Sequence, residues 1–171
     1  MSLYARLQDA VERQRAGRFP EAEQIYREIL ARDARQPDAL HLLGLAAYQQ
    51  GRGEEAVNWI GQAIAAHPRA AAFHNNLGNA LVSLGRLAEA VESFGRALRL
   101  EPANGAAHLN LGNAHFAAGR MEAAADCFRE AVRLLPECDE AHNSLGNALA
   151  RLGRGAEALG RLAEAIRLRP A

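Results

Sequence analysis

The stretch that decides the fold runs from Leu77 to Pro102 and reads LGNALVSLGRLAEAVESFGRALRLEP. Its apolar residues recur at spacings of three and four, which places them on one stripe of a helix. Gly85 lies where a first helix would end, because glycine readily adopts the left-handed conformation that often follows a helix. Pro102 cannot continue a second helix. The stretch therefore predicts most of a helical hairpin.

The same pattern returns every 34 residues along the chain. The Gly-Arg pairs begin at Gly17, Gly51, Gly85, Gly119 and Gly153, the Leu-Gly pairs at Leu43, Leu77, Leu111 and Leu145, and the closing prolines are Pro68, Pro102, Pro136 and Pro170. A single hairpin of this kind cannot cover its own apolar face, so neighbouring hairpins must stack. The sequence thus predicts a helical repeat protein.

This unit resembles the tetratricopeptide repeat, in which Leu-Gly, Ala, an aromatic residue, Ala and Pro follow one another in this order. The resemblance implies an all-α fold, a right-handed α-solenoid of five antiparallel helical hairpins. We expect a single array over residues 1–171, with repeats at about 3–36, 37–70, 71–104, 105–138 and 139–171. The first repeat departs from the pattern, since Asp9-Ala10 stands where Leu-Gly is expected. The first aromatic position of the family instead holds His74, His108 and His142.

Composition excludes several classes of function. The formal net charge is +0, and all 20 basic residues of the Lys+Arg count are arginine. Nucleic-acid and anionic-membrane surfaces normally need a basic excess, so neither is an expected partner. No apolar run has the length of a signal peptide or a membrane span, and Cys127 and Cys138 are too few for a disulfide framework. We expect a cytoplasmic protein without membrane insertion. That it is bacterial is implied only by the resemblance of its repeats to those of bacterial proteins.

Catalytic patterns are also missing from the sequence. It contains no Gly-x-Ser-x-Gly, no Gly-x-Gly-x-x-Gly and no phosphate-loop lysine. Equivalent helices of neighbouring repeats lie about 8–10 Å apart, so the three periodic histidines could not share one metal ion. We expect no enzymatic activity, no catalytic residue, no metal and no cofactor.

One face of the first helices carries a ladder of asparagines that becomes apolar towards the N-terminus. An asparagine amide offers both a donor and an acceptor, so it can pair with the backbone of an extended peptide. In the resembled family this face is the concave, ligand-binding groove. The predicted peptide-binding residues are Tyr48, Asn75, Asn76, Asn79, Asn110, Asn113, Phe116, Asn143 and Asn147. The alternative is that these amides bond to neighbouring helices or to water.

The leading functional interpretation is a non-enzymatic scaffold that binds a protein or peptide ligand. The repeats also resemble those of bacterial O-linked N-acetylglucosaminyltransferase-like proteins, so a substrate-recruiting region of a larger glycosyltransferase is an alternative. A third interpretation is a self-assembling array. It rests on the last predicted helix, which keeps Leu159, Leu162, Ala163 and Ile166 on one apolar stripe and could join copies through the C-terminal end.

Overall fold

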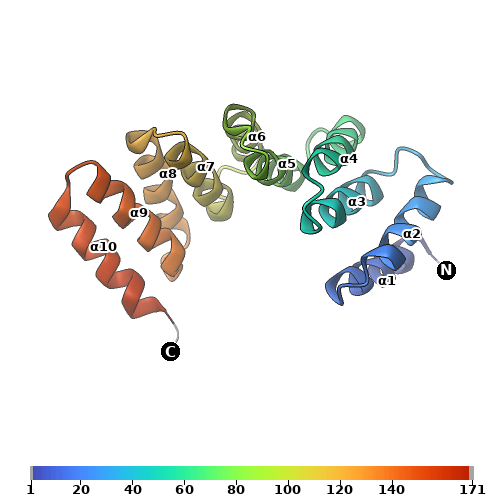
Figure 1. Cartoon of the computed structure of the whole chain (residues 1–171), viewed down its shortest axis with the longest axis horizontal. Coiled ribbons are helices and arrows are strands. Elements are labelled where there is room, and N and C mark those ends of the chain that lie inside the picture. The colour runs from blue at the N-terminus through green and yellow to red at the C-terminus, as the bar shows by residue number, and fades with distance from the viewer. Residues whose placement is uncertain (1, 170–171) are drawn as a thin grey trace. The chain divides into compact units, whose positions relative to one another are not determined.

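The computed structural model describes residues 2–169, which form ten α-helices and no β-strand (Figure 1). The helices are α1 (Leu3–Arg15), α2 (Phe19–Leu30), α3 (Pro37–Gln49), α4 (Gly53–Ala66), α5 (Ala71–Ser83), α6 (Leu87–Leu100), α7 (Gly105–Ala117), α8 (Met121–Leu134), α9 (Asp139–Arg151) and α10 (Gly155–Leu168). The predicted all-α helical-repeat fold is confirmed. Within the described residues, no helix is long and apolar enough to cross a bilayer. Pro170, predicted to close the fifth unit, lies outside the described residues.

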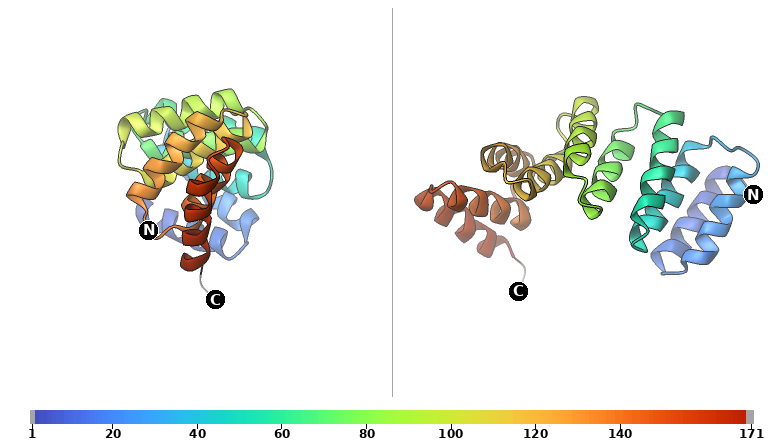
Figure 2. Two further views of the ribbon diagram at one scale, coloured as in Figure 1. Left: turned by 90° about the vertical axis from the view of Figure 1, so that its left-hand side faces the viewer. Right: turned by 45° about the horizontal axis from the view of Figure 1, so that its top comes forward.

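The chain forms two compact units, Met1–Leu84 with α1 to α5 and Gly85–Ala171 with α6 to α10. Within each unit, helices that follow one another in sequence pack side by side (Figure 2). In the first unit α3 packs against α4, and in the second unit α7 packs against α8 and α9 against α10. That all five repeats form one array stays a prediction.

Each first helix ends two residues before the glycine of a Gly-Arg pair. Gly17, Gly51, Gly85, Gly119 and Gly153 all have positive φ, between 72° and 76°. At the first turn, Gly17 N–H donates to the Gln14 carbonyl at 3.0 Å and Arg18 N–H donates to the Arg13 carbonyl at 2.9 Å. These two bonds form a Schellman motif, which satisfies carbonyl groups that the helix end leaves open. The arginine then directly precedes the second helix.

In three hairpins the glycine of the Leu-Gly pair lets the two helices approach closely. A Cβ at Gly44 would lie 2.6 Å from Cγ1 of Ile60, and one at Gly146 would lie 2.7 Å from Cγ of Leu162. A Cβ at Gly112 would lie 2.5 Å from Cδ1 of Phe128, whose side chain is fully buried. In these three hairpins the large residue of the second helix therefore occupies the space that a first-helix side chain would need.

The periodic histidines bond to the turn that precedes their own helix. The Nε2 atoms of His74, His108 and His142 lie 2.9, 3.0 and 3.0 Å from the carbonyl oxygens of Pro68, Pro102 and Pro136. A carbonyl oxygen only accepts, so Nε2 of each ring carries a proton and donates it. The structure thus gives these histidines a structural role, because each ties an inter-repeat turn to the next first helix.

His41 lies on α3, contacts α5 and is bonded differently. Its ring centroid is 4.3 Å from that of Phe73, and its Nε2 lies 2.8 Å from the amide nitrogen of Asn76. The amide nitrogen can only donate, so His41 Nε2 accepts and the imidazole is neutral. Burial lowers the pKa of His41 to about 4, although the nearby Asp38 carboxylate opposes the shift.

The close approach at Gly112 predicts the effect of a single methyl group. Gly112→Ala should lower the free energy of unfolding by about 1–3 kcal/mol, because the added carbon would overlap the buried Phe128 ring. The matched control is Gly160→Ala within α10, where nothing lies within 4 Å. It should raise stability by up to about 1 kcal/mol through helix propensity. Guanidinium denaturation measures both, and an equal effect of the two changes would contradict the packing argument.

The low pKa of His41 predicts acid sensitivity. Between about pH 6.5 and pH 4 the unfolded chain takes up a proton at this residue and the folded chain does not, so stability should fall as the pH falls. The full contribution is about 3 kcal/mol, from 1.36 kcal/mol per pKa unit. Leucine occupies the equivalent positions Leu7 and Leu109. The change His41→Leu should therefore reduce the dependence of stability on pH. Urea titrations at pH 7 and pH 4.5 test it, and parallel pH profiles would overturn the assignment.

Candidate functional site

All nine predicted peptide-binding residues lie on first helices of the repeats. Tyr48 is on α3, Asn75, Asn76 and Asn79 are on α5, Asn110, Asn113 and Phe116 are on α7, and Asn143 and Asn147 are on α9. Tyr48, Asn113 and Asn147 are exposed, and the other six are partly exposed. The first four belong to the first unit and the other five to the second, so each unit carries its own part of the ladder.

The asparagines differ in whether their amides are already engaged. Asn76 binds His41 across one repeat, and Asn75 and Asn110 also have interaction partners. Within residues 2–169, no hydrogen bond is formed by the side chains of Asn79, Asn113, Asn143 and Asn147. The ladder is therefore divided. Asn76 has one bond of the kind that the alternative interpretation expects, whereas four amides keep their donors and acceptors for another molecule or for water.

The apolar end of the ladder is a pocket between α1 and α3, with a volume of about 400 Å³. Leu7, Val11 and Leu42 supply apolar wall, and Tyr4 stands beside them with 70% of its surface exposed. Gln8, Glu12, Arg15, Asp38 and His41 complete the lining. Bulky apolar ligand groups bind in such concave sites when a few polar groups orient them.

Sequence reasoning placed the apolar patch on the second repeat and missed the contribution of α1. The first repeat lacks the Leu-Gly pair, and its first helix was not included in the predicted patch. The signal was present in the spacing, because Leu7 and Val11 stand 68 residues before Asn75 and Asn79. The first repeat thus carries apolar groups at the positions where later repeats carry asparagine.

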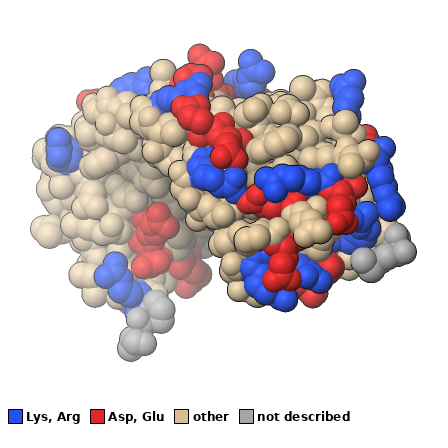
Figure 3. Space-filling view, turned by 45° about the vertical axis from the view of Figure 1, so that its right-hand side comes forward, with Lys and Arg blue, Asp and Glu red and all other residues tan. Residues whose placement is uncertain are grey.

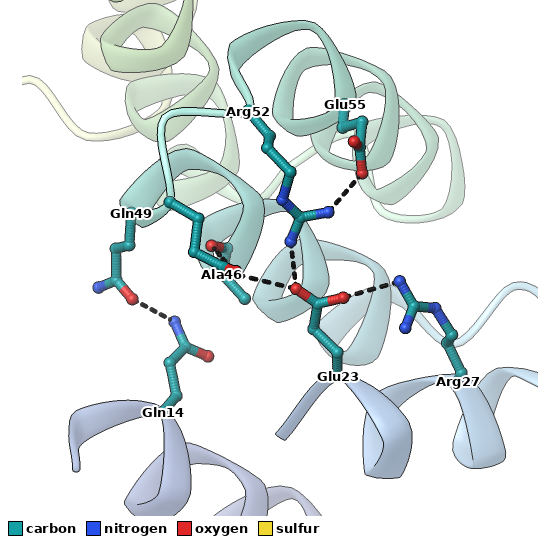
Figure 4. Close-up of polar contacts among 8 residues, drawn as sticks. Gln14, Glu23, Arg27, Ala46, Gln49, Arg52 and Glu55 are labelled. Carbon is teal, nitrogen blue, oxygen red and sulfur yellow. Dashed lines mark hydrogen bonds and ion pairs between the residues drawn. The ribbon is translucent and has the colours of Figure 1, made fainter. Parts of the chain in front are cut away.

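A buried polar cluster around Glu23 was also missed (Figure 4). The Glu23 carboxylate accepts from Arg27 at 2.7 Å, from Gln50 at 2.8 Å and from Arg52, which in turn binds Glu55 at 2.6 Å. Burial would raise the pKa of Glu23, but the bond from Gln50 and the charges of Arg52 and Arg27 outweigh it and lower the pKa. With its oxygens held by these donors, the carboxylate joins α2 to the next repeat and does not resemble a general base.

Neither a metal-holding cluster nor an activated Cys127 thiol is present in the described part of the chain. Within residues 2–169, no three His, Cys, Asp or Glu side chains are grouped so that they could hold a metal ion. Burial, assisted by the charge of Asp126, raises the pKa of the Cys127 thiol to about 11. The thiolate is the nucleophilic form, so this cysteine is unreactive near neutral pH.

Charged side chains of both signs are interspersed on the surface (Figure 3). Many are paired within one helix, at spacings of three or four. Arg86 binds Glu89 and Arg154 binds Glu157, each at 2.7 Å. Such exposed pairs contribute little to stability individually, typically about 0–1 kcal/mol.

Three solved structures share the fold over nearly the whole chain. A crystal structure of MamA is 20% identical, covers 98% of this chain and 95% of its own, and has a TM-score of 0.87. MamA from Desulfovibrio magneticus RS-1 is 21% identical, covers 96% and 93%, and also scores 0.87. Pseudomonas aeruginosa PilF is 20% identical, covers 98% and 76%, and scores 0.89. At these identities the likeness concerns the fold.

Among curated proteins, the cellulose synthase operon protein C of Komagataeibacter xylinus is 40% identical over 65 residues, which is 38% of this chain. The chain spans only 5% of the length of that protein. Sequence models of one family match most of the chain, one at residues 75–137 and 122–171 and another at residues 14–80. With its repeated Gly-Arg turns and Leu-Gly contacts, this chain belongs to the tetratricopeptide repeat family.

Proposed function

We propose that the chain is a non-enzymatic scaffold that binds an extended segment of a partner protein along its first helices. The observation that carries this proposal is the set of four first-helix asparagines without an intramolecular hydrogen bond within the described residues, Asn79, Asn113, Asn143 and Asn147. Amides of this kind can pair with a peptide backbone whatever its side chains are. The affinity for a ligand then depends on the shape and the backbone of the bound segment, and not on a charged terminus of the ligand.

The pocket between α1 and α3 supplies the side-chain contact that the asparagines do not. Its volume of about 400 Å³ accommodates one large apolar side chain beside Leu7, Val11 and Leu42. Tyr48 is 37% exposed on α3 and extends the apolar surface in the same unit. A ligand would therefore be an extended segment with a bulky apolar residue that anchors it. The role of recruiting substrate for a larger glycosyltransferase is a narrower hypothesis of the same kind.

Self-association through the C-terminal end is a second candidate function. Leu159 and Ile166 of α10 are 70% and 73% exposed. Their equivalents in the second repeat, Val57 and Ile64, pack against the core that α4 forms with its neighbours. Among the described helices only α9 packs against α10, whereas α4 packs against both α3 and α5.

Charge at the other end of the chain decides how two copies would meet. On α1 and α2, Arg13 binds Asp9 at 2.9 Å and Glu21 at 2.5 Å, and Arg6 binds Glu28 at 2.6 Å. An apolar face gains little from covering such a charged one, which would lose hydration. We therefore infer a symmetric, two-fold contact between two α10 faces in place of a head-to-tail chain.

The asparagine ladder can be tested with a peptide selected on the whole chain from a phage-displayed random library. The double change Asn113→Ala and Asn147→Ala should weaken its binding by about 1–3 kcal/mol, because each amide is lost as a partner. Val11→Asn introduces the residue found at this position in the last three repeats. It should weaken the binding only of peptides that carry a bulky apolar residue. Titration calorimetry measures both. The control is Asn58→Ala on the second helix α4. Equal affinities of all variants and the unaltered chain would contradict the proposal and indicate that the asparagines have a structural role.

Sedimentation equilibrium over a wide range of concentrations tests the second candidate. The unaltered chain should show a mass that rises towards that of a dimer. Leu159→Glu combined with Ile166→Glu should remain monomeric, since two charges cannot be buried without partners. Glu23 occupies the position equivalent to Leu159 in the first repeat, so glutamate is compatible with the helix there. Leu3→Glu at the opposite end is the control, and a strictly monomeric unaltered chain would refute this candidate.

A further inference from the structure

The third repeat departs from the charge pattern of its neighbours on helix α6. In the fourth and fifth repeats an arginine of the second helix is paired with a glutamate three residues earlier. Arg133 binds Glu130 at 2.9 Å, and Arg167 binds Glu164 at 2.6 Å. In the third repeat the equivalent arginine is Arg99, but the glutamate position is taken by Arg96. Two exposed arginines thus lie one turn apart, and neither forms an ion pair within residues 2–169.

A second departure lies at the turn that follows α7. The arginine of the Gly-Arg pair has a glutamate partner three residues later at Glu21, Glu55, Glu89 and Glu157. Arg120 has Ala123 at that position and forms no ion pair in the described part of the chain. The positive charge of Arg120 acts on the His115 ring. Burial lowers the pKa of that histidine most, and Arg120 lowers it further.

The first departure lies in the wall of one pocket of the second unit, and the second acts on His115 of the same wall. Between α6 and α7 lies a space of about 470 Å³, lined by Val91, Glu92, Gly95, Arg96, Arg99, Leu111 and His115. Arg99 folds back along its own helix, with Nη1 only 3.6 Å from where a Cβ at Gly95 would lie. The pocket uses Leu111 and His115 of α7, whereas the proposed peptide groove uses Asn110 and Asn113. It is therefore a separate surface.

The charge balance of this pocket is positive. Arg96 and Arg99 line it and Arg120 adjoins His115 in its wall, whereas Glu92 is the one carboxylate of the lining. Like charges three residues apart on a helix repel each other unless an anion lies between them. Unpaired guanidinium groups bind carboxylates with two parallel hydrogen bonds, which are stronger than bonds between neutral groups. Val91 and Leu111 add apolar wall beside these donors.

We propose that the pocket between α6 and α7 binds an acidic segment of a protein partner, with neighbouring carboxylates on Arg96 and Arg99 and an apolar side chain against Val91 and Leu111. The spacing supports two carboxylates, because Cβ atoms three residues apart on a helix lie about 5–6 Å from each other. Arg120 strengthens the local field. The site acts beside the peptide groove, so a partner with an acidic stretch could occupy it whether or not the groove is filled.

The test uses the whole chain and a fluorescein-labelled hexapeptide of alternating Glu and Leu, with a Gln/Leu hexapeptide as the neutral probe. Fluorescence anisotropy should show binding of the acidic peptide that weakens steeply as the salt concentration rises. Arg96→Glu should weaken it at least about tenfold, because it removes one donor and gives Arg99 the partner that Arg133 has in Glu130. Glutamate is the natural residue at the equivalent Glu28, Glu130 and Glu164, so the variant is expected to fold.

The matched control is Arg161→Glu on α10, which changes the net charge equally and lies outside this pocket. It should keep the affinity of the unaltered chain. The combined Asn113→Ala and Asn147→Ala changes should also leave it intact, so the pocket and the peptide groove can fail independently. Equal binding by the Arg96→Glu variant, or equal binding of the neutral probe, would overturn the proposal. Inorganic phosphate that displaces the peptide at equal concentration would show a simple anion site and overturn it as well.

Discussion

The close approach of two helices at a glycine is the contact on which the rest of this structure depends. Where Gly44, Gly112 and Gly146 lack a side chain, Ile60, Phe128 and Leu162 of the second helices fill the space. The packing fixes the distance between the two helices of a hairpin, and thus which residues remain at its surfaces. Only after that distance is set can asparagines stand along one side and ion pairs along another. The functional surfaces are what this packing leaves uncovered.

Much of the fold could be predicted from the sequence because its causes lie within one repeat. A positive φ at Gly17 or Gly153, and a helix stop near Pro68 or Pro102, depend on residues a few positions away. The candidate site was harder to predict, because its contacts join different repeats. Asn76 was expected to face a ligand, but its partner His41 lies 35 residues earlier. The Glu23 cluster spans a similar interval, since Arg52 lies 29 residues later. No local pattern encodes such pairs.

A repeat protein offers its own reference for judging which residues are unusual. The same position occurs five times in nearly the same surroundings, so an exchange at one position can be compared with four others. Glu23 stands where later repeats have Val57, Val91, Ala125 and Leu159, and it is buried among donors. Arg96 stands where three other repeats have glutamate, and it is unpaired within the described residues. Hydrogen bonds and ion pairs within the chain explain the exchange at Glu23, whereas the exchange at Arg96 leaves a positive charge available to another molecule.

The five Gly-Arg turns also offer a way to measure how cooperatively the repeats of this chain unfold. A Cβ at Gly17, Gly51, Gly85, Gly119 or Gly153 would meet nothing within 4 Å, so alanine there would disturb only the backbone, by about 1–2 kcal/mol. The five substitutions are thus nearly identical perturbations applied at five places. In a stack with nearest-neighbour coupling, each would lower the global stability equally only if all repeats unfolded together. Unequal losses would map where the chain separates into independently melting parts.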